Sequence, residues 1–400
     1  MSVGSEGTSF LTDFWTEKYL REYIASGGSK IKFVSGRPGS GKTYFLQQML
    51  GRAEEEGYLT ANFSAREVWL NDFKEVYVQI LRQCDLMHCL ESCADQIVRS
   101  MGYRPEDIPE GMTFMDYLSA QGVADPLTKR EIRAQIREFF LSDPILDNNF
   151  ALACSILTGG ILGHPALERS NRELLLGWLE GSRDVKLALL RPLGLSPSKI
   201  TKYNARHMLR SLAEVVHLAG FPGIFVAIDD LEIMLNHTSG SEMNYTRVRR
   251  EDTYESIRQM VDDIDNMGSI MIVFAFDRTL IDDEKYGVKS YQALWMRIQN
   301  EVRSPRFNRF ADIVDMDRME AQEYSVRTVI QMSEEMAARE MEKSCRCMIL
   351  TEQEAQDILV QAQTGAVGIP GLVHGMLLRA GEPAKKDDNG ESRGLQSGRD

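Results

Sequence analysis

Short apolar runs alternate with amphipathic segments along two stretches of the chain. The apolar runs predict five β-strands, at residues 31–35, 58–63, 223–228, 269–276 and 311–316. Apolar residues at helical spacing predict helices between these strands, at residues 43–56, 70–87, 253–264 and 291–302. Strands that alternate with helices in this way are typical of a parallel α/β sheet.

The rest of the chain is predicted to be mainly helical. Residues 91–205 show no convincing strand and are broken repeatedly by glycine and proline, which predicts a large helical insertion. Residues 319–381 predict a small C-terminal helical lid. Residues 382–400 lack large apolar side chains apart from one leucine and predict a disordered tail. Residues 1–90 and 206–318 then make up the α/β core.

Composition narrows the class of protein. Hydrophobic residues make up 43% and charged residues 26% of the 400 residues, which excludes a fully disordered, a collagen-like or a disulfide-scaffold chain. The 46 basic and 59 acidic side chains give a net charge of −13. A chain this acidic does not coat nucleic acid by bulk charge, so any contact with DNA has to come from a local basic patch.

The cysteines and the longest apolar run indicate the cellular compartment in which we expect the protein. Six sparse cysteines, and a start without a basic or apolar leader segment, favour a reducing cytoplasm. The apolar run at residues 150–163 is shorter than the roughly 20 residues that span a bilayer, so we expect a buried helix or helix pair and no membrane span. Cys84, Cys89 and Cys93 lie on one predicted helix without paired C-x-x-C spacing, and we interpret them as core or surface thiols rather than metal ligands.

A glycine-rich turn follows the first predicted strand and precedes the first predicted helix. Its sequence fits the phosphate-binding pattern G-x-x-x-x-G-K-[ST] through Gly36, Arg37, Pro38, Gly39, Ser40, Gly41, Lys42 and Thr43. The glycines let backbone N–H groups surround phosphates, and the positive end of the following helix favours the same anions. Lys42 is then expected to reach the β- and γ-phosphates, and the Thr43 hydroxyl to bind Mg²⁺. The turn predicts an ATP and Mg²⁺ site, with a purely structural turn as the alternative.

A second acidic element follows the third predicted strand. The apolar residues end in Asp229, Asp230, Leu231 and Glu232. Asp229 is expected to bind Mg²⁺, and Asp230 to polarise the attacking water. Aspartate is one methylene shorter than the glutamate usual at this second position, and a misplacement of about 1 Å can cost roughly a hundredfold in rate. We therefore expect slow hydrolysis and keep Glu232 as the other candidate base.

Further candidates lie between the end of the fourth predicted strand and the start of the fifth. Asp277 ends the fourth strand at the level of the γ-phosphate if the strands are ordered 5-1-4-3-2, and is a candidate polar sensor; a turn or helix-capping aspartate is the alternative. Arg303 and Arg297 precede the fifth strand, where arginines can reach the γ-phosphate of a neighbouring subunit. A solvated basic face is the alternative for both.

A cluster of arginines lies beyond the acidic strand end. Arg247, Arg249 and Arg250 fall in a segment predicted as a polar loop. Such a cluster can face the phosphates of duplex DNA or line a pore. A solvated loop is the alternative.

Together these motifs resemble a known family. The stretches FVSGRPGSGKTYFLQQML, AGFPGIFVAIDDLEIM and REDTYESIRQMVDDID are similar to AAA+ ATPases of the initiator-like branch. More narrowly, they resemble the ATP-binding proteins of BREX-type bacteriophage-exclusion defence systems. The resemblance implies a P-loop AAA+ core with a five-stranded parallel sheet in the order 5-1-4-3-2, Mg²⁺ at Asp229 and a catalytic acid at Asp230. It also implies a lid arginine near residues 368–372, where this chain carries glycine, and Arg379 is the candidate substitute for that arginine.

Two functional hypotheses follow. The first is an ATPase that assembles into a homo-oligomer, acts with other defence-system proteins on invading DNA and uses ATP hydrolysis to assemble or remodel that complex. The second is a nucleotide-gated oligomeric scaffold that recruits partners to DNA with negligible hydrolysis. Lys42, Thr43 and Asp229 favour the first hypothesis. The shorter Asp230 and the missing lid arginine favour the second.

Overall fold

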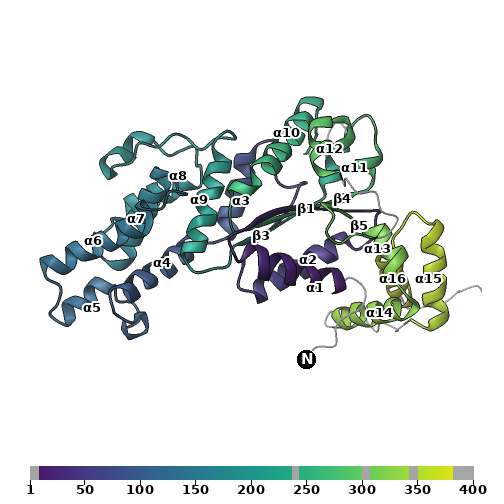
Figure 1. The fold of residues 1–400 in the computed structure, drawn as a ribbon, viewed down its shortest axis with the longest axis horizontal. Helices are drawn as coiled ribbons and strands as arrows, with labels where there is room; N and C mark the ends of the chain where they lie inside the picture. The colour runs from purple at the N-terminus through teal and green to yellow at the C-terminus, as the bar shows by residue number, and fades with distance from the viewer. Residues whose placement is uncertain (1–8, 237–242, 300–306, 342–349, 382–400) are drawn as a thin grey trace, which may run out of the picture.

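The computed structural model describes residues 9–236, 243–299, 307–341 and 350–381. Its strands are β1 Ser29–Gly36, β2 Leu59–Ser64, β3 Ile224–Asp229, β4 Ile270–Asp277 and β5 Ile313–Asp315. They form one parallel sheet in the order β2-β3-β4-β1-β5, which is 5-1-4-3-2 counted from the opposite edge (Figure 1). The five predicted strands are confirmed, each within two residues of its expected bounds.

Strand register brings the polar strand ends together. Gly36 at the end of β1 pairs with Asp277 at the end of β4, and Ser64 at the end of β2 pairs with Asp229 at the end of β3. In open parallel sheets, ligands bind outside the carboxyl ends of the strands. A ligand site is therefore expected at the edge formed by these four residues.

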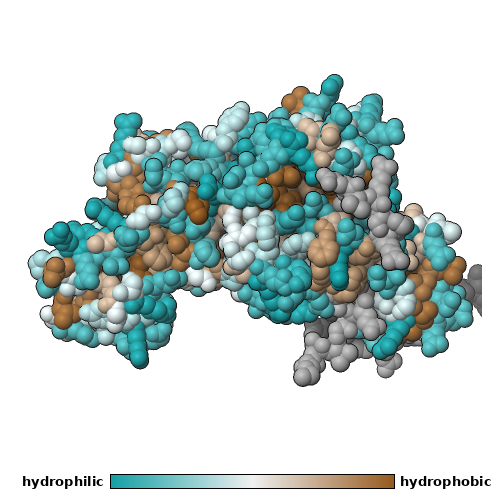
Figure 2. Space-filling view, viewed as in Figure 1, coloured by the Kyte–Doolittle hydropathy of each residue, from teal (hydrophilic) through white to brown (hydrophobic). Residues whose placement is uncertain are grey.

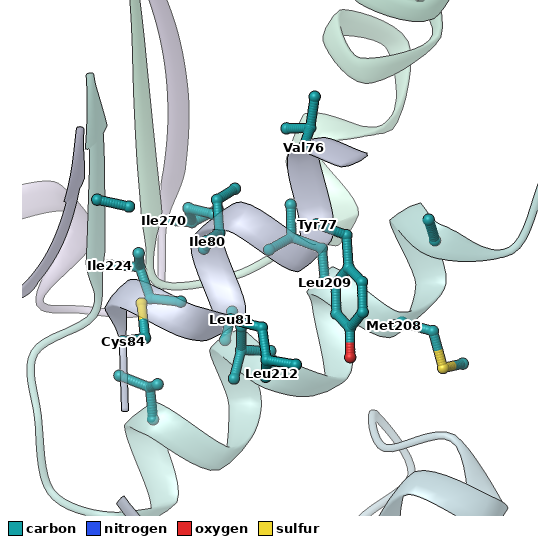
Figure 3. Packing of buried hydrophobic residues seen from close by; sticks show 14 of the residues in the cluster. Val76, Tyr77, Ile80, Leu81, Cys84, Met208, Leu209, Leu212, Ile224 and Ile270 are labelled. Atoms are coloured by element: carbon teal, nitrogen blue, oxygen red, sulfur yellow. The ribbon is translucent and has the colours of Figure 1, made fainter. Parts of the chain in front are cut away.

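Helices cover both faces of the sheet (Figure 1). One face carries α1 Ser9–Trp15, the π-helix η1 Thr16–Ile24 and α2 Lys42–Glu55, and the other carries α3 Phe73–Gln83, α9 Ala205–Leu218 and α10 Arg247–Asp263. Neighbouring residues of each strand alternate between the two cores: Phe225 packs in the core on the α2 side, whereas Ile224 packs in the other core. Figure 3 shows Ile80 of α3 and Leu209 of α9 in the cluster that contains Ile224.

A long helical segment joins α3 to α9 and extends to one side of the sheet (Figure 1). It contains α4 Leu86–Ser100, η2 Pro105–Asp107, α5 Phe114–Ala120, α6 Pro126–Leu141, α7 Asn148–Leu162, α8 Arg169–Leu179 and η3 Leu187–Leu193. The apolar run at residues 150–163 forms most of α7, whose residues are largely buried. No helix in the described ranges is both long and apolar enough to cross a bilayer.

The single helix expected over residues 70–87 was wrong. The chain leaves α3 at Cys84, and Asp85 adopts a left-handed backbone with φ 44°. The Asp85 carboxylate accepts a hydrogen bond from the backbone N–H of His88 at 3.2 Å and so caps α4. Cys84 therefore lies at the end of one helix, and Cys89 lies in the next.

The remaining elements lead to a helical lid on the side of the sheet opposite the insertion (Figure 1). Between the strands lie η4 Leu231–Leu235, η5 Ile264–Asn266, α11 Thr279–Asp282, η6 Val288–Ser290 and α12 Gln292–Ile298. The lid consists of α13 Met316–Glu323, α14 Val326–Met341, α15 Glu352–Thr364 and α16 Ile369–Gly381. Its buried residues, among them Met319 and Val373, belong to the same apolar cluster as Phe45 of α2. The lid thus packs on the face of the sheet that carries α2.

Candidate nucleotide site

The glycine-rich turn connects the end of β1 to the start of α2 at the edge of the sheet. Gly39 and Gly41 have φ of 75° and 82°, a backbone region that glycine enters without steric cost. Gly41 directly precedes Lys42, the first residue of α2. The turn therefore presents the N-terminus of a 14-residue helix, whose free N–H groups favour an anion.

Lys42 lies inside this turn and is buried. Its Nζ donates hydrogen bonds to the carbonyl oxygens of Gly36 and Arg37, each at 3.0 Å. The same ammonium lies 2.6 Å from Oδ1 of Asp277. Strand register explains the ion pair, because Asp277 stands beside Gly36 at the ends of β4 and β1.

Thr43 and Asp229 meet next to Lys42. The Thr43 hydroxyl donates to Oδ2 of Asp229 at 2.6 Å, so the first turn of α2 contacts the end of β3. Burial raises the pKa of the Asp229 carboxyl, although the Thr43 hydrogen bond opposes that shift. A hydroxyl and a carboxylate oxygen placed together form the hard donor set that Mg²⁺ prefers, and this pair fits the metal predicted from the sequence.

The Asp230 side chain contacts other residues than Asp229 does. Its backbone is left-handed, with φ 61°. Oδ2 accepts a hydrogen bond from the Ser64 hydroxyl at 2.6 Å, and Oδ1 lies 3.1 Å from Nε of Arg66. Ser64 is the last residue of β2 and Arg66 lies two residues beyond it. Strand β2 is the neighbour of β3 in the sheet. The side chain expected to polarise water is therefore already bonded on both oxygens.

Glu232 completes the arrangement on the other side. One carboxylate oxygen lies 3.2 Å from Nη2 of Arg66, and the other accepts the backbone N–H of Asp277 at 3.0 Å. Burial raises the pKa of the Glu232 carboxyl. A continuous series of hydrogen bonds and ion pairs thus connects Thr43 to Lys42 through the acidic end of β3, Arg66 and Asp277. Arg66 is shared by both candidate bases, and sequence reasoning missed it.

Arg37 of the turn is engaged by the lid. Its backbone N–H donates to both carboxylate oxygens of Asp317, each at 3.1 Å. Its guanidinium donates to Oε2 of Glu320 at 3.1 Å and to the carbonyl oxygens of Ala362 and Gly365 at 2.6 and 2.8 Å. The Arg37 side chain therefore fastens the turn to α13 and to the end of α15.

The lid also contacts the turn through backbone atoms. The N–H of Gly368 donates to the carbonyl of Pro38 at 2.9 Å, and the N–H of Gly371 donates to the carbonyl of Gly39 at 2.8 Å. A Cβ at Gly368 would lie 2.5 Å from Cα of Ser40, and a Cβ at Gly371 would lie 2.8 Å from Cα of Gly39. Glycine at these positions is thus required by the close approach of two backbones.

A comparison with known families shows the family to which the chain belongs. The profile of the family described as BREX system ATP-binding protein BrxC/D matches residues 18–370. This span includes the glycine-rich turn, the acidic strand end and most of the lid. The chain belongs to this family. The resemblance drawn from the motifs is thereby confirmed, whereas no curated protein and no solved structure matches the chain.

Within this BREX ATP-binding protein, the arginines predicted to reach a neighbouring subunit are only partly described. Arg297 lies in α12, forms an ion pair with Asp262 of α10 and donates to the carbonyl of Ala293 at 2.7 Å. Arg303 lies outside the described residues. The lid residue Arg379 is part of α16, but its side chain also lies outside them.

The expected DNA-facing cluster needs correction. Arg247, Arg249 and Arg250 lie in the first turn of α10 and not in a loop, because the helix, capped by Thr246, begins six residues before its predicted start. Arg250 is only 4% exposed, stacks at 4.5 Å over the Tyr286 ring and donates to a backbone carbonyl. A buried side chain of this kind does not reach a DNA phosphate.

The other two arginines of this cluster are exposed but have partners. Arg247 is paired with Glu251 at 2.8 Å, and Arg249 lies 4.4 Å over the ring of Trp69.

The four cysteines that the structure describes are buried free thiols at positions 84, 89, 93 and 154. Burial raises the pKa of each of these thiols, and that of Cys89 to about 12. Among the described residues, no group of three or more His, Cys, Asp or Glu side chains is arranged to hold a metal ion. The four cysteines are packed in the apolar core, where a small apolar thiol is a suitable side chain.

Proposed function

We propose that the chain binds ATP with Mg²⁺ at residues 36–43 and hydrolyses it slowly to ADP and phosphate. The observation that carries this proposal is the meeting of Lys42, Thr43 and Asp229 at one edge of the sheet, with the Thr43 hydroxyl 2.6 Å from the Asp229 carboxylate. The family to which the chain belongs, one of ATP-binding proteins, supports the choice of nucleotide.

Each residue has a role that its chemistry suits. Lys42 holds phosphate oxygens once it leaves Asp277, and Thr43 and Asp229 hold Mg²⁺, which when bound neutralises phosphate charge. Asp230 is the first candidate to orient the attacking water and Glu232 the second. Asp277 acts as a polar sensor, because the Lys42 ammonium passes from the Asp277 carboxylate to the phosphates when the nucleotide binds.

Steady-state phosphate release tests this assignment. We expect Asp230→Asn to lower turnover by about a hundredfold while ATP binding persists, and Asp230→Glu to raise turnover by restoring reach. Glu17→Gln, an exposed carboxylate on η1, serves as the control. If Glu232→Gln alone abolishes turnover and both Asp230 variants are silent, then Glu232 is the base.

A second candidate function is a nucleotide-gated scaffold. The observation that favours it is that Ser64 and Arg66 each hold one oxygen of Asp230, so this carboxylate is oriented toward β2 and not left to orient a water molecule alone. This candidate predicts ATP-dependent assembly with no phosphate release above that of Lys42→Ala. The same release measurement therefore separates the two functions.

We also propose that the chain acts as a homo-oligomer with other proteins of the defence system. Arg303 and then Arg297 are the candidates for reaching the nucleotide of a neighbouring subunit. Arg297 would have to leave Asp262 to do so. Mixing Lys42→Ala subunits with Arg303→Ala subunits should partly restore turnover, because each supplies the group that the other lacks. Turnover that is independent of concentration and not rescued by mixing would show a site complete within one chain.

For contact with duplex DNA we propose Arg247 and Arg249, since both are exposed. Replacing both with alanine should reduce the dependence of DNA affinity on salt by about two phosphates, with each phosphate contributing a slope near −0.9. An unchanged slope would assign DNA contact to other residues or to a partner protein.

A further inference from the structure

A cavity in the helical insertion has no part in the nucleotide site. It has a volume of 290 Å³ and is lined by residues of α6 and α7, of η3 and of the segment 165–171. Its apolar lining comprises Ile136, Ile156, Pro165, Ala166, Leu167 and Leu193. Figure 2 shows apolar patches among polar side chains over this part of the molecule. For comparison, an apolar cavity of about 150 Å³ accommodates benzene, so this cavity holds a body of roughly twice that size.

Four polar side chains complete the lining: Arg133, Arg137, Ser155 and Asn171. Within the described ranges, none of these four side chains has a hydrogen bond or an ion pair with another residue. Ser155 is only 9% exposed. Because Ser155 lines the cavity, its hydroxyl is available to form a hydrogen bond with a ligand there.

The charge of the lining indicates the kind of ligand. Arg133 and Arg137 are one helical turn apart on the same face of α6, and no aspartate or glutamate lines the cavity. Guanidinium groups bind carboxylate and phosphate oxygens with paired hydrogen bonds. The apolar lining in turn suits a ligand with an apolar body. A bare sugar–phosphate backbone provides no such body.

We propose that this cavity binds an amphipathic anion, in which an apolar body fills the space between α6 and α7 and a single oxyanion pairs with Arg133 and Arg137. Ser155 and Asn171 supply further hydrogen bonds to the polar end. The oxyanion is the carboxylate or phosphate of a free small molecule, or the terminal carboxylate of a peptide chain that ends in an apolar residue.

Calorimetric titration of the full chain tests the proposal with three probes and their uncharged counterparts. The probes are sodium octanoate, hexyl phosphate and N-acetylphenylalanine, compared with octanamide, hexanol and N-acetylphenylalanine amide. We expect at least one probe to bind saturably with a Kd of about 0.1–1 mM, and its uncharged counterpart to bind about tenfold more weakly. Preference for N-acetylphenylalanine indicates a chain terminus, and preference for octanoate or hexyl phosphate indicates a free ligand.

Variants on one helix provide a matched control. Arg133→Gln and Arg137→Gln should each weaken binding about tenfold, and Ser155→Ala about threefold. Arg130→Gln should leave binding unchanged, because Arg130 does not line this cavity, although it lines the adjacent groove of 640 Å³ together with Arg133 and Arg137. Ala166→Trp at the exposed rim should block the cavity without removing charge. Unchanged melting temperatures and ATP affinities verify that each variant is folded.

Two results overturn the proposal. One is the absence of saturable binding for every probe. The other is an equal loss of affinity in Arg130→Gln and Arg133→Gln, which would mean that the probes respond to surface charge and not to the cavity.

Discussion

The Lys42 ammonium lies 2.6 Å from the Asp277 carboxylate, at the edge of the sheet where β1 and β4 end. A phosphate that binds to the turn needs the same ammonium. In the proposed site, the nucleotide and Asp277 would therefore compete for one cation, and the ion pair would have to break when phosphate binds. We accordingly expect Asp277 to influence both how tightly ATP binds and how the occupied site is arranged.

Replacing Asp277 with asparagine should raise ATP affinity about three- to tenfold. Lys42 would no longer have to leave an ion pair, which for a partly buried pair corresponds to about 1 kcal/mol. Turnover should fall, because the sensor carboxylate is lost. Calorimetry and phosphate release measure the two effects, with the exposed Asp282→Asn as control. A lower ATP affinity in Asp277→Asn would show that the carboxylate itself contributes to nucleotide binding.

Ser64→Ala and Arg66→Ala should each raise turnover severalfold and leave ATP affinity unchanged. Each substitution removes a competing partner from one oxygen of Asp230, which leaves that oxygen more available to water. Phosphate release measured at saturating ATP tests this, with Arg82→Ala on α3 as a surface control. Lower turnover in both variants would mean that Ser64 and Arg66 position Asp230 productively.

The lid glycines should tolerate no side chain where two backbones touch. We expect Gly368→Ala to destabilise the protein by about 1–3 kcal/mol, because its Cβ would lie 2.5 Å from Cα of Ser40. Gly375→Ala in α16, the helix that begins directly after Gly368, is the matched control, since a Cβ there meets nothing within 4 Å. Chemical unfolding measures both. Equal stability of the two variants would contradict the close contact between lid and turn.

The buried Glu320 should make the contact between the lid and the turn sensitive to pH. Burial raises the pKa of this carboxyl to about 7, and Asp317 adds to the shift, whereas hydrogen bonds from Arg37 and from the backbone of Ile369 oppose it. A carboxyl whose pKa is raised on folding favours the folded state below its unfolded pKa, and that contribution is lost as the pH rises through about 7.

We therefore expect Glu320→Gln to stabilise the protein relative to the wild type by about 2–3 kcal/mol at pH 8 and by little near pH 5. Denaturant unfolding at the two pH values provides the measurement. Glu323→Gln, an exposed carboxylate on the same helix, should show no such difference. A Glu320→Gln effect that is the same at both pH values would contradict the raised pKa.

The sequence predicted the parts of the site that depend on local motifs. The turn from Gly36 to Thr43 and the acidic end of β3 each lie within a few consecutive residues, and apolar runs predicted the strands that bring them together. Ser64 and Arg66 were not predicted, because only the register of β2 against β3 places them beside Asp230.

Other contacts were beyond sequence reasoning for similar reasons. Arg37 meets Asp317 and Glu320 across about 280 residues, and no periodicity signals a pairing at that separation. Arg250 was expected in a loop because polar residues conceal the start of α10, and the Thr246 cap was not recognised. The break at Asp85 went unnoticed because an apolar pattern continues across it, and a single left-handed residue leaves that pattern intact.

The binding of Mg²⁺-ATP to the wild type and to Lys42→Ala, measured by calorimetry, tests the proposed site most directly. Lys18→Ala, which removes an exposed lysine paired with Glu22, serves as the control, and melting curves verify folding. We expect the control to match the wild type and Lys42→Ala to bind at least about a hundredfold more weakly, since the ammonium makes charge-assisted contacts to the phosphates. Undiminished ATP affinity in folded Lys42→Ala would contradict nucleotide binding at residues 36–43.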